Sequence, residues 1–242
     1  MSYYASFLRE SPPAASLRVM REGWSRLACY LPILLITLLV GCETTATTDQ
    51  AVHYGPFYTP RNFAGESALP VDFRRVLVLP LSVGRVASPE TGKTLDPLLL
   101  AALQEQQRFE VVALSREECL WWFGREEFTS TEALPHGFFD KLAARYAIDG
   151  VLFVDLTHYR ADRPQAIGLR AKLATIREIR LIWNFDEIIS ADNPAVANSV
   201  RRQFLKTDRG NQPMDLSLAA LRSPSRFAAF AAGEMFRTLP PR

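Results

Sequence analysis

The sequence is poor in the residues from which catalytic and metal sites are built. It holds three cysteines and three histidines among 242 residues, and His53, His136 and His158 stand far apart. No two of them have the spacing of metal ligands on one helix or hairpin, so we expect no metal site. No serine lies in a Gly-x-Ser-x-Gly motif, and we therefore expect a non-enzymatic protein with no catalytic residues and no cofactor.

The sequence also lacks a long hydrophobic segment. Its longest uncharged apolar run, Leu27–Val40, has 14 residues, whereas a helix that spans a bilayer needs about 20. Arg18, Arg21 and Arg26 precede this run, and a basic segment followed by a short apolar one is typical of an export signal. The alternative is a buried hydrophobic helix that happens to end in a cysteine.

The apolar run ends in four residues that resemble the lipobox of bacterial lipoprotein precursors, namely Leu39, Val40, Gly41 and Cys42. The resemblance implies that residues 1–41 are a signal peptide that is cut off before Cys42. It also implies that Cys42 receives a thioether-linked diacylglycerol and further acyl chains such as palmitate. These lipids would then hold the mature protein at a membrane.

Cleavage before Cys42 would remove 41 of the 242 residues and leave 201, enough for one domain. The full chain has 28 basic and 26 acidic residues; the signal takes away four arginines and two glutamates and leaves 24 of each. A neutral chain gives no support for a nucleic-acid partner. Cys29 leaves with the signal and Cys42 carries lipid, so Cys119 has no partner for an intramolecular disulfide.

The flanks of the signal raise further expectations. Initiation at Met20 would keep two arginines before the apolar run, and we expect Met20 to be the true start. Glu43 follows the lipidated cysteine in place of the Asp that resembles an inner-membrane retention signal, so we expect the periplasmic face of the outer membrane. The polar run Glu43–Gln50 is typical of a flexible tether. Residues 42–74 would thus be a tether and extended lead-in to a periplasmic domain at 75–239.

The segment 75–239 predicts a single α/β domain with a mixed sheet, because short apolar runs alternate with helical patterns. Buried strands are expected at 76–79, 109–114 and 150–154, and helices at 94–106, 115–122 and 138–146. Two alternating runs, at 167–174 and 181–186, then predict an antiparallel hairpin. Asn193-Pro194 and Ser223-Pro224 predict the starts of two C-terminal helices.

Three segments of this domain carry a resemblance to a known group: RVLVLP at 75–80, GVLFVDLTHYR at 150–160, and IGLRAKLATI at 167–176 with a strand ending in LIW. With the lipobox, they make the chain resemble the curli-secretion-channel lipoprotein superfamily. That group shares its α/β fold with the lipoprotein activators of penicillin-binding proteins and the amino-terminal domain of TolB. The resemblance implies a binding or scaffolding component of an envelope machine, with a protein partner. The hairpin turn departs from the group, with Glu178-Ile179 in place of Thr-Gly. The chain also lacks the long amphipathic segments that would form transmembrane hairpins, so we do not expect a pore.

The alternative function is a nucleotide-binding enzyme. Ala87–Thr94 fits a degenerate phosphate loop, in which Lys93 would contact the terminal phosphates, Thr94 a magnesium ion, and Asp155 would lie behind that ion. Pro89 removes an N–H from the middle of this cradle. The competing interpretation is a solvent-exposed loop in which Thr94 caps the following helix.

The aromatic cluster Trp121–Phe123 and the neighbouring cysteine allow two interpretations. One is that all three rings pack in the core. The other is a surface for a partner that includes Trp121 or Trp122, because adjacent helical residues point about 100° apart. Cys119 lies beside apolar Leu120, which predicts a buried core thiol, with an exposed inert thiol and a nucleophile as alternatives.

Overall fold

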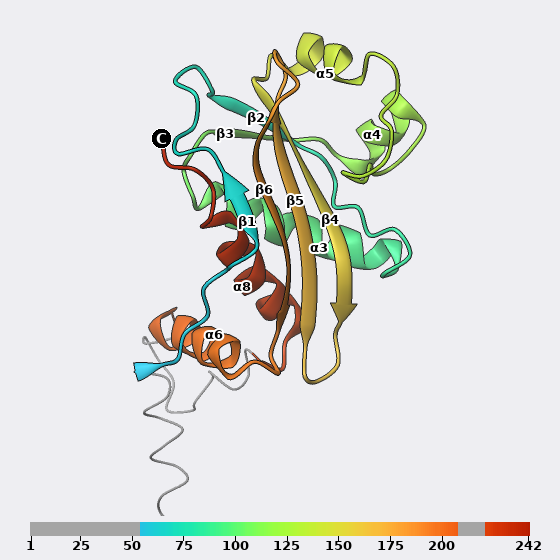
Figure 1. Cartoon of the computed structure of the whole chain (residues 1–242). Helices are drawn as coiled ribbons and strands as arrows, with labels where there is room; N and C mark the ends of the chain where they lie inside the picture. The colour runs from blue at the N-terminus through green and yellow to red at the C-terminus, as the bar shows by residue number, and fades with distance from the viewer. Residues whose placement is uncertain (1–53, 208–220) are drawn as a thin grey trace, which may run out of the picture. The chain divides into compact units, whose positions relative to one another are not determined.

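The computed structural model describes residues 54–207 and 221–242. The chain divides into two units, Met1–Gln50 and Ala51–Arg242, and every described residue belongs to the second. Its helices are α3 (Pro89–Gln104), α4 (Arg116–Phe123), α5 (Phe138–Tyr146), α6 (Pro194–Thr207) and α8 (Pro224–Phe236). Its strands are β1 (Phe63–Gly65), β2 (Arg75–Val78), β3 (Glu110–Ala113), β4 (Gly150–Arg160), β5 (Ala166–Thr175) and β6 (Leu181–Ser190) (Figure 1). The predicted α/β class is confirmed.

The six strands form one mixed sheet in the order β1-β6-β5-β4-β2-β3. β2 pairs in parallel with β3 and with β4, as expected for strands that are joined through helices. β4, β5 and β6 form an antiparallel meander of long strands. The sheet therefore has a parallel half, which holds the helical connections, and an antiparallel half built of hairpins.

Helices cover the two faces of this sheet unequally. α3 and α8 lie against one face, behind the sheet in Figure 1, and the larger core there includes residues from β4, β5 and β6. α4 and α5 cover the opposite face only at the parallel half, where a smaller core forms. The buried members of this smaller core are Leu77, Leu79, Leu114, Cys119, Phe128, Phe138, Leu142, Ile148, Val151 and Phe153.

The predicted hairpin is confirmed as β5 and β6, but the alternation at 181–186, which predicts Leu181 on the buried face with Trp183 and Phe185, is wrong at Leu181. The inward residues of β5 alternate as expected, and Trp183 and Phe185 of β6 are buried. The register shifts between Leu173 and Ala174, so Ile182 is an extra residue in β6. This irregularity turns Leu181 outward, with 44% of its surface exposed, and places Ile182 inside.

Trp183 is the largest fully buried side chain of the hairpin. Its indole N–H donates to Thr238 Oγ1 at 3.1 Å, just beyond the end of α8. Its ring stacks near Phe185 and Phe236, at centroid distances of 6.5 and 6.3 Å. The side chain therefore joins the antiparallel half of the sheet to α8.

The lead-in before β2 contains a strand that the sequence did not predict. β1 pairs antiparallel with β6 at the edge of the sheet, and Phe63 lies opposite Phe185. All three of its residues are exposed, so the segment has no apolar alternation from which a strand could be predicted. Further along the lead-in, Leu69 and Phe73 are buried against the larger core.

α3 begins five residues earlier than predicted. Ser88 is its N-cap, with a side chain that accepts from the N–H of Thr91, and Pro89 occupies the first turn, where its missing N–H costs nothing. The predictions of a solvent loop at Ala87–Thr94 and of Thr94 as the helix cap are therefore wrong. Gly92 lies inside the helix, where an added Cβ would stand 2.6 Å from an Arg116 nitrogen.

The other predicted helix starts are confirmed. Ser115 forms the expected capping box with Glu118 at the start of α4. Asn193 accepts from the N–H of Ala195 before α6, and Ser223 accepts from that of Arg226 at the start of α8.

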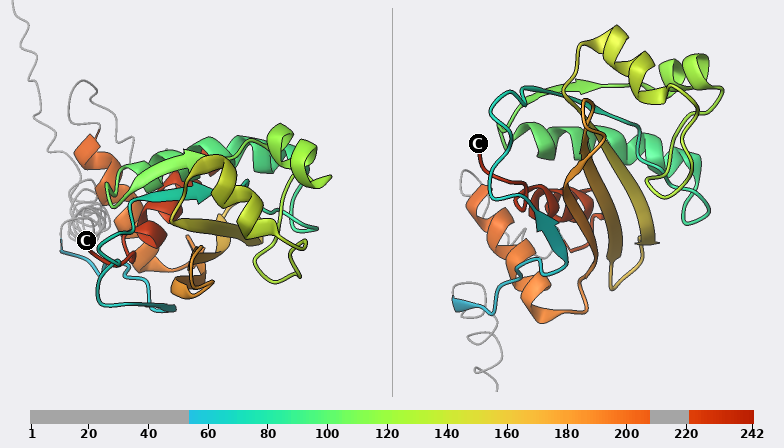
Figure 2. Two further views of the ribbon diagram at one scale, coloured as in Figure 1. Left: turned by 90° about the horizontal axis from the view of Figure 1, so that it is seen from above. Right: turned by 45° about the horizontal axis from the view of Figure 1, so that its top comes forward.

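The described chain enters the domain beside α6. Tyr58 donates its N–H to Ser199 Oγ at 2.9 Å, and Asn198 Nδ2 donates to the carbonyl of Pro56 at 3.2 Å. This entry lies at one end of the sheet, and α4, α5 and the turn between β5 and β6 lie at the other, in Figure 1 and in the right view of Figure 2.

Candidate functional site

α4 carries the most exposed aromatic cluster among the described residues. Trp121 is 75% exposed, Trp122 is 39% exposed, and Leu120 beside them is 46% exposed. The two indole rings meet edge to face, with centroids 4.5 Å apart. Packing of all three rings of Trp121–Phe123 in the core is therefore the wrong interpretation. Leu120, Trp121 and Trp122 are called the α4 surface below.

The helix exposes these rings because only one of its sides meets the core. Its buried residues are Arg116 and Cys119, while Phe123 is half-buried and packs against the rings of Phe128 and Phe138. Gly124 ends the helix in the left-handed conformation, at φ 74°.

Cations lie beside the aromatic rings of this region. Arg145 of α5 stands 6.0 Å from the centroid of Trp122, and Lys141 stands 6.0 Å from that of Phe123. These distances are at the limit of a cation–π contact. The α4 surface is therefore an apolar patch with basic groups along its α5 side.

A buried arginine fixes α4 to the rest of the domain. Arg116 donates from Nε to Asp96 Oδ2 of α3 at 2.7 Å and from Nη1 to Glu127 Oε2 at 2.9 Å. Its Nη2 donates to the carbonyl of Leu81 at 2.7 Å. Burial by itself would lower the pKa of the guanidinium, but the hydrogen bonds to Asp96 and Glu127 outweigh burial and raise it. The charge is thus paired on two sides.

The two carboxylates of this network also bind backbone. Glu127 Oε1 accepts from the N–H groups of Val83 and Gly84 at 3.0 and 3.1 Å, and Asp96 Oδ1 accepts from that of Leu81 at 2.9 Å. Arg116 therefore connects α3, the loop after β2 and the loop after α4. A buried ion pair of this kind holds its elements in one arrangement, because a buried charge that loses its counter-charge is strongly destabilising.

Asp155, assigned to magnesium in the nucleotide alternative, has a structural partner instead. Its carboxylate accepts from Ser130 N at 2.9 Å and from Ser130 Oγ at 2.5 Å. Lys172 of β5 donates to the carbonyl of the same serine at 2.9 Å. Asp155 and Lys172 thus hold the loop between α4 and α5 against the sheet.

The other residues of the nucleotide alternative are engaged within α3. Lys93 Nζ donates to Glu90 Oε1 at 2.9 Å, and Thr94 Oγ1 donates to the carbonyl of Glu90 at 2.9 Å. A phosphate cradle needs backbone N–H groups that are free of helical bonds, and Glu90–Thr94 lie in helix. The structure does not form the loop that this alternative requires.

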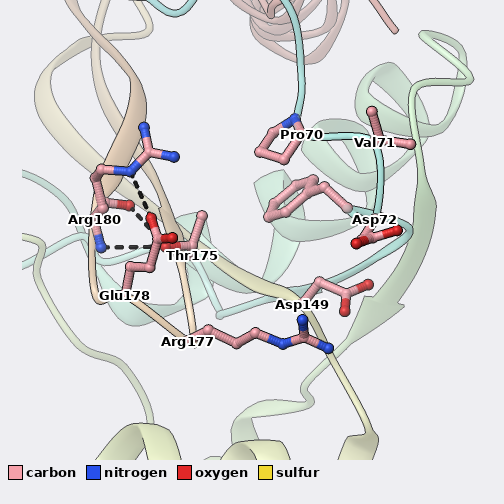
Figure 3. Close-up of a pocket in the computed structure, with 9 residues that line it drawn as sticks. Pro70, Val71, Asp72, Asp149, Thr175, Arg177, Glu178 and Arg180 are labelled. Atoms are coloured by element: carbon pink, nitrogen blue, oxygen red, sulfur yellow. Dashed lines mark hydrogen bonds and ion pairs between the residues drawn. The ribbon is translucent and has the colours of Figure 1, made fainter.

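A pocket of about 200 Å³, lined by both charged and apolar residues, lies beside the turn between β5 and β6 (Figure 3). Its acidic groups are largely engaged, because Asp149 accepts from the N–H groups of Arg74 and Arg75, and Glu178 accepts from Arg180. The residues that line it include no histidine, cysteine or serine. Its lining thus contains no Ser–His or Cys–His pair of the kind used in nucleophilic catalysis.

The remaining predicted site residues stand apart. Cys119 is fully buried, and burial raises the pKa of its thiol to about 11, so the prediction of a core thiol is confirmed. His136 and His158 lie on different segments, and His53 lies outside the described residues. Within residues 54–207 and 221–242, no three His, Cys, Asp or Glu side chains gather as metal ligands would.

The proposed membrane anchor cannot be placed on the structure. Cys42 and Leu39–Gly41 lie outside the described residues, as does Met20. In the part of the chain that is described, no helix combines the length and apolar character needed to cross a membrane.

Comparisons with known proteins found similar solved structures only. No protein-family model matches the sequence, and no curated protein matches it. The crystal structure of lipoprotein GNA1162 from Neisseria meningitidis is 18% identical, with a TM-score of 0.39 over 50% of this chain and 85% of that chain. The PelC dodecamer from Paraburkholderia phytofirmans is 13% identical, with a TM-score of 0.38 over 61% and 96%.

The LpoB C-terminal domain from Salmonella enterica is 18% identical, with a TM-score of 0.30 over 48% of this chain and 82% of that chain. The similar structures thus include a bacterial lipoprotein. Identities and TM-scores this low do not carry a function from those proteins to this chain. The resemblance to the curli-secretion-channel superfamily stays a prediction.

Proposed function

We propose that this chain is a lipid-anchored, non-enzymatic protein of the bacterial cell envelope that binds a protein partner through the α4 surface. The observation that carries the proposal is the exposure of Trp121 and Trp122 side by side on a helix that Arg116 holds in place. Tryptophans on a rigid helix supply a large contact area at a small cost in conformational entropy. Contiguous exposed apolar side chains commonly mark a binding surface.

The anchor is proposed from the sequence. Basic residues, a short apolar run and Gly41-Cys42 occur in the order of a lipoprotein signal. Glu43 after the cysteine supports sorting to the periplasmic face of the outer membrane. Initiation at Met20 belongs to the same proposal, and so does a role as an accessory or scaffolding component of an envelope machine.

The position of the α4 surface favours a protein partner over a lipid one. The chain that leads from Cys42 enters the domain beside α6, and α4 lies at the opposite end (Figure 1). An anchor at Cys42 would therefore hold the α6 end nearer to the bilayer and present the α4 surface to the periplasm.

The anchor is tested by replacing Cys42 with serine, on which a thioether cannot form. We expect the wild-type chain to take up a radiolabelled or clickable fatty acid and to fractionate with the outer membrane. The Cys42→Ser variant should lose both the label and the membrane retention. Membrane retention of this variant at the normal mature size would refute the anchor.

The binding surface is tested by placing a photo-cross-linking amino acid at position 121 in living cells. The matched control is position 188, because Ile188 is 58% exposed on the open face of β6, away from α4. We expect one defined cross-linked protein from position 121, identified by mass spectrometry, and none from position 188. The same products from both positions, or none from 121, would contradict the proposal.

A further inference from the structure

The end of the domain at which the chain enters is basic. α6 contains three basic residues, Arg201, Arg202 and Lys206, and no acidic residue. Arg222 is exposed just before the cap of α8, and Arg226 follows one turn later. By contrast, α4 and α5 both mix acidic and basic residues. Basic residues therefore prevail in α6 and at the start of α8, in a chain whose predicted mature form is neutral.

Two of these arginines lie over aromatic rings, which places α6, the lead-in and α8 side by side. The Arg202 guanidinium stands 4.3 Å from the ring centroid of Phe57, and that of Arg226 stands 5.3 Å from the centroid of Phe204. Tyr54, the first described residue, is 86% exposed. Arg202, Arg222, Arg226 and Arg237, with the rings among them, are called the basic face below.

Three carboxylates near the basic face have partners within the domain. Glu234 is buried and accepts from Arg237 Nη1 at 2.8 Å through both of its oxygens. Glu187 accepts from the backbone N–H groups of Arg61 and Asn62. Glu234 thus pairs with Arg237, and Asp192, exposed just before α6, pairs with Arg160 at 2.7 Å.

We propose that the basic face binds the anionic phospholipid headgroups of the membrane to which the chain is anchored. This inference rests on the anchor at Cys42 proposed above. Twelve residues lead from Cys42 to Tyr54, and a chain of that length spans at most about 40 Å. The tether therefore keeps the basic face close to the bilayer, and a weak surface contact gains from the high effective concentration.

The chemistry of the basic face fits a phosphate-bearing surface. A guanidinium group binds phosphate oxygens through paired N–H donors, and basic residues near an anionic bilayer strengthen attachment additively. Tyrosine is among the residues that favour the interface between headgroups and acyl chains. Contact at this face orients the domain with α6 toward the membrane and the α4 surface away from it.

The test uses the chain from Cys42 onward, coupled through the Cys42 thiol to a maleimide-headgroup lipid in vesicles. Cys119 is fully buried and does not compete. Chemical coupling does not require lipidation in the cell. A lack of headgroup contact in this experiment is therefore distinguishable from a failure of the proposed anchor. Phenylglyoxal then modifies exposed arginines, and mass spectrometry gives the rate at each site. Vesicles of phosphatidylcholine alone are compared with vesicles that also contain phosphatidylglycerol.

We expect phosphatidylglycerol to slow the modification of Arg202, Arg222 and Arg237 by about threefold or more at about 50 mM salt, and about 500 mM salt to abolish this protection. Arg177, exposed on the turn between β5 and β6, is the internal control and should react equally on both vesicles. Equal rates at Arg202 and Arg222 on the two vesicles, or equal protection of Arg177, would overturn the proposal.

A charge-reversed variant with a matched control completes the test. In Arg202→Glu with Arg222→Glu, we expect Arg237, whose side chain is 66% exposed, to lose its protection on anionic vesicles. Arg177→Glu removes the same kind of charge at the far end of the sheet and should leave the protection unchanged. Protection that survives the double variant, or that Arg177→Glu also removes, would refute the assignment of the surface.

Discussion

α8 and α4 are helices of one domain that are held in place by different means. α8 buries eight of its thirteen residues, among them Phe227, Phe230 and Met235, and it packs against the larger core. α4 buries two of its eight residues, and one of these is the arginine of an ionic network. Apolar packing uses the apolar side chains of α8. The ionic attachment of α4 leaves its apolar side chains exposed, where a partner can contact them.

The largest effect is expected on the α8 side. Trp183→Ala would leave a cavity beside Phe236 and remove the hydrogen bond to Thr238. We expect the free energy of unfolding to fall by about 3–5 kcal/mol, measured by denaturant titration. A loss below about 1 kcal/mol would mean that α8 is not fixed through this side chain.

The next largest effect is expected on the α4 side. Arg116→Met removes the cation and leaves Asp96 and Glu127 without it, so we expect a loss of about 2–4 kcal/mol in the free energy of unfolding. Arg125→Met is the matched control, because Arg125 is half-exposed and pairs at the surface with Glu132. It should cost less than about 1 kcal/mol. Equal effects would remove the distinction between the network and ordinary surface pairs.

The buried thiol of α4 gives a dependence on pH. Burial raises the pKa of Cys119 to about 11, and unfolding returns it to about 8.5–9. The unfolded state then binds fewer protons above about pH 9, so this part of the stability is present below that pH and is lost as pH rises toward 11.

We expect the stability advantage of the wild type over Cys119→Ala to shrink by up to about 2–3 kcal/mol between about pH 8 and pH 11. Denaturant unfolding of both proteins at each pH gives this difference and cancels the titration of other groups. A difference that does not change with pH would show that the thiol ionises in the folded protein as it does in the unfolded chain.

The smallest effect is expected at Lys93. Its side chain is 54% exposed and pairs with Glu90 one turn away, so Lys93→Ala should change the free energy of unfolding by less than about 0.5 kcal/mol. The function of the protein in the cell envelope should also stay unchanged. A stable Lys93→Ala protein that has lost function would instead support the alternative in which Lys93 binds phosphate.

Most elements were predictable where their causes are local. The caps at Ser115, Asn193 and Ser223 act within three residues of their own positions, and the alternation in β5 follows from one buried face. The interiors of these elements could therefore be read from short windows of sequence.

The errors arose where distant segments decide the outcome. β1 is a strand because β6 lies beside it, and its own residues carry no signal. Ala87–Thr94 was predicted to be a loop, but Gly92 within it lies inside α3 against Arg116, which is 24 positions away in the sequence.

The candidate site was predictable only in part. The cluster at Trp121 and Trp122 stood out in the sequence, but the attachment of its helix through Arg116, Asp96 and Glu127 joins residues that no short motif connects. Among the chemical candidates that lie in the described residues, Cys119 has the environment that its neighbours predicted. Asp155 resembled a magnesium ligand because a buried strand precedes it, whereas its partner Ser130 comes from a distant loop.

The central claim is that the α4 surface serves recognition and contributes little to stability. Its most direct test is the double variant Trp121→Ala with Trp122→Ala, compared with wild type and with Ile188→Ala. We measure the free energy of unfolding of each, and the yield of the partner identified by cross-linking when each protein is recovered from solubilised membranes. We expect the double variant to lose less than about 1 kcal/mol of stability and at least about tenfold of the partner yield, whereas Ile188→Ala should retain both. A double variant that unfolds like Trp183→Ala, or one that recovers the partner as well as wild type does, would contradict it.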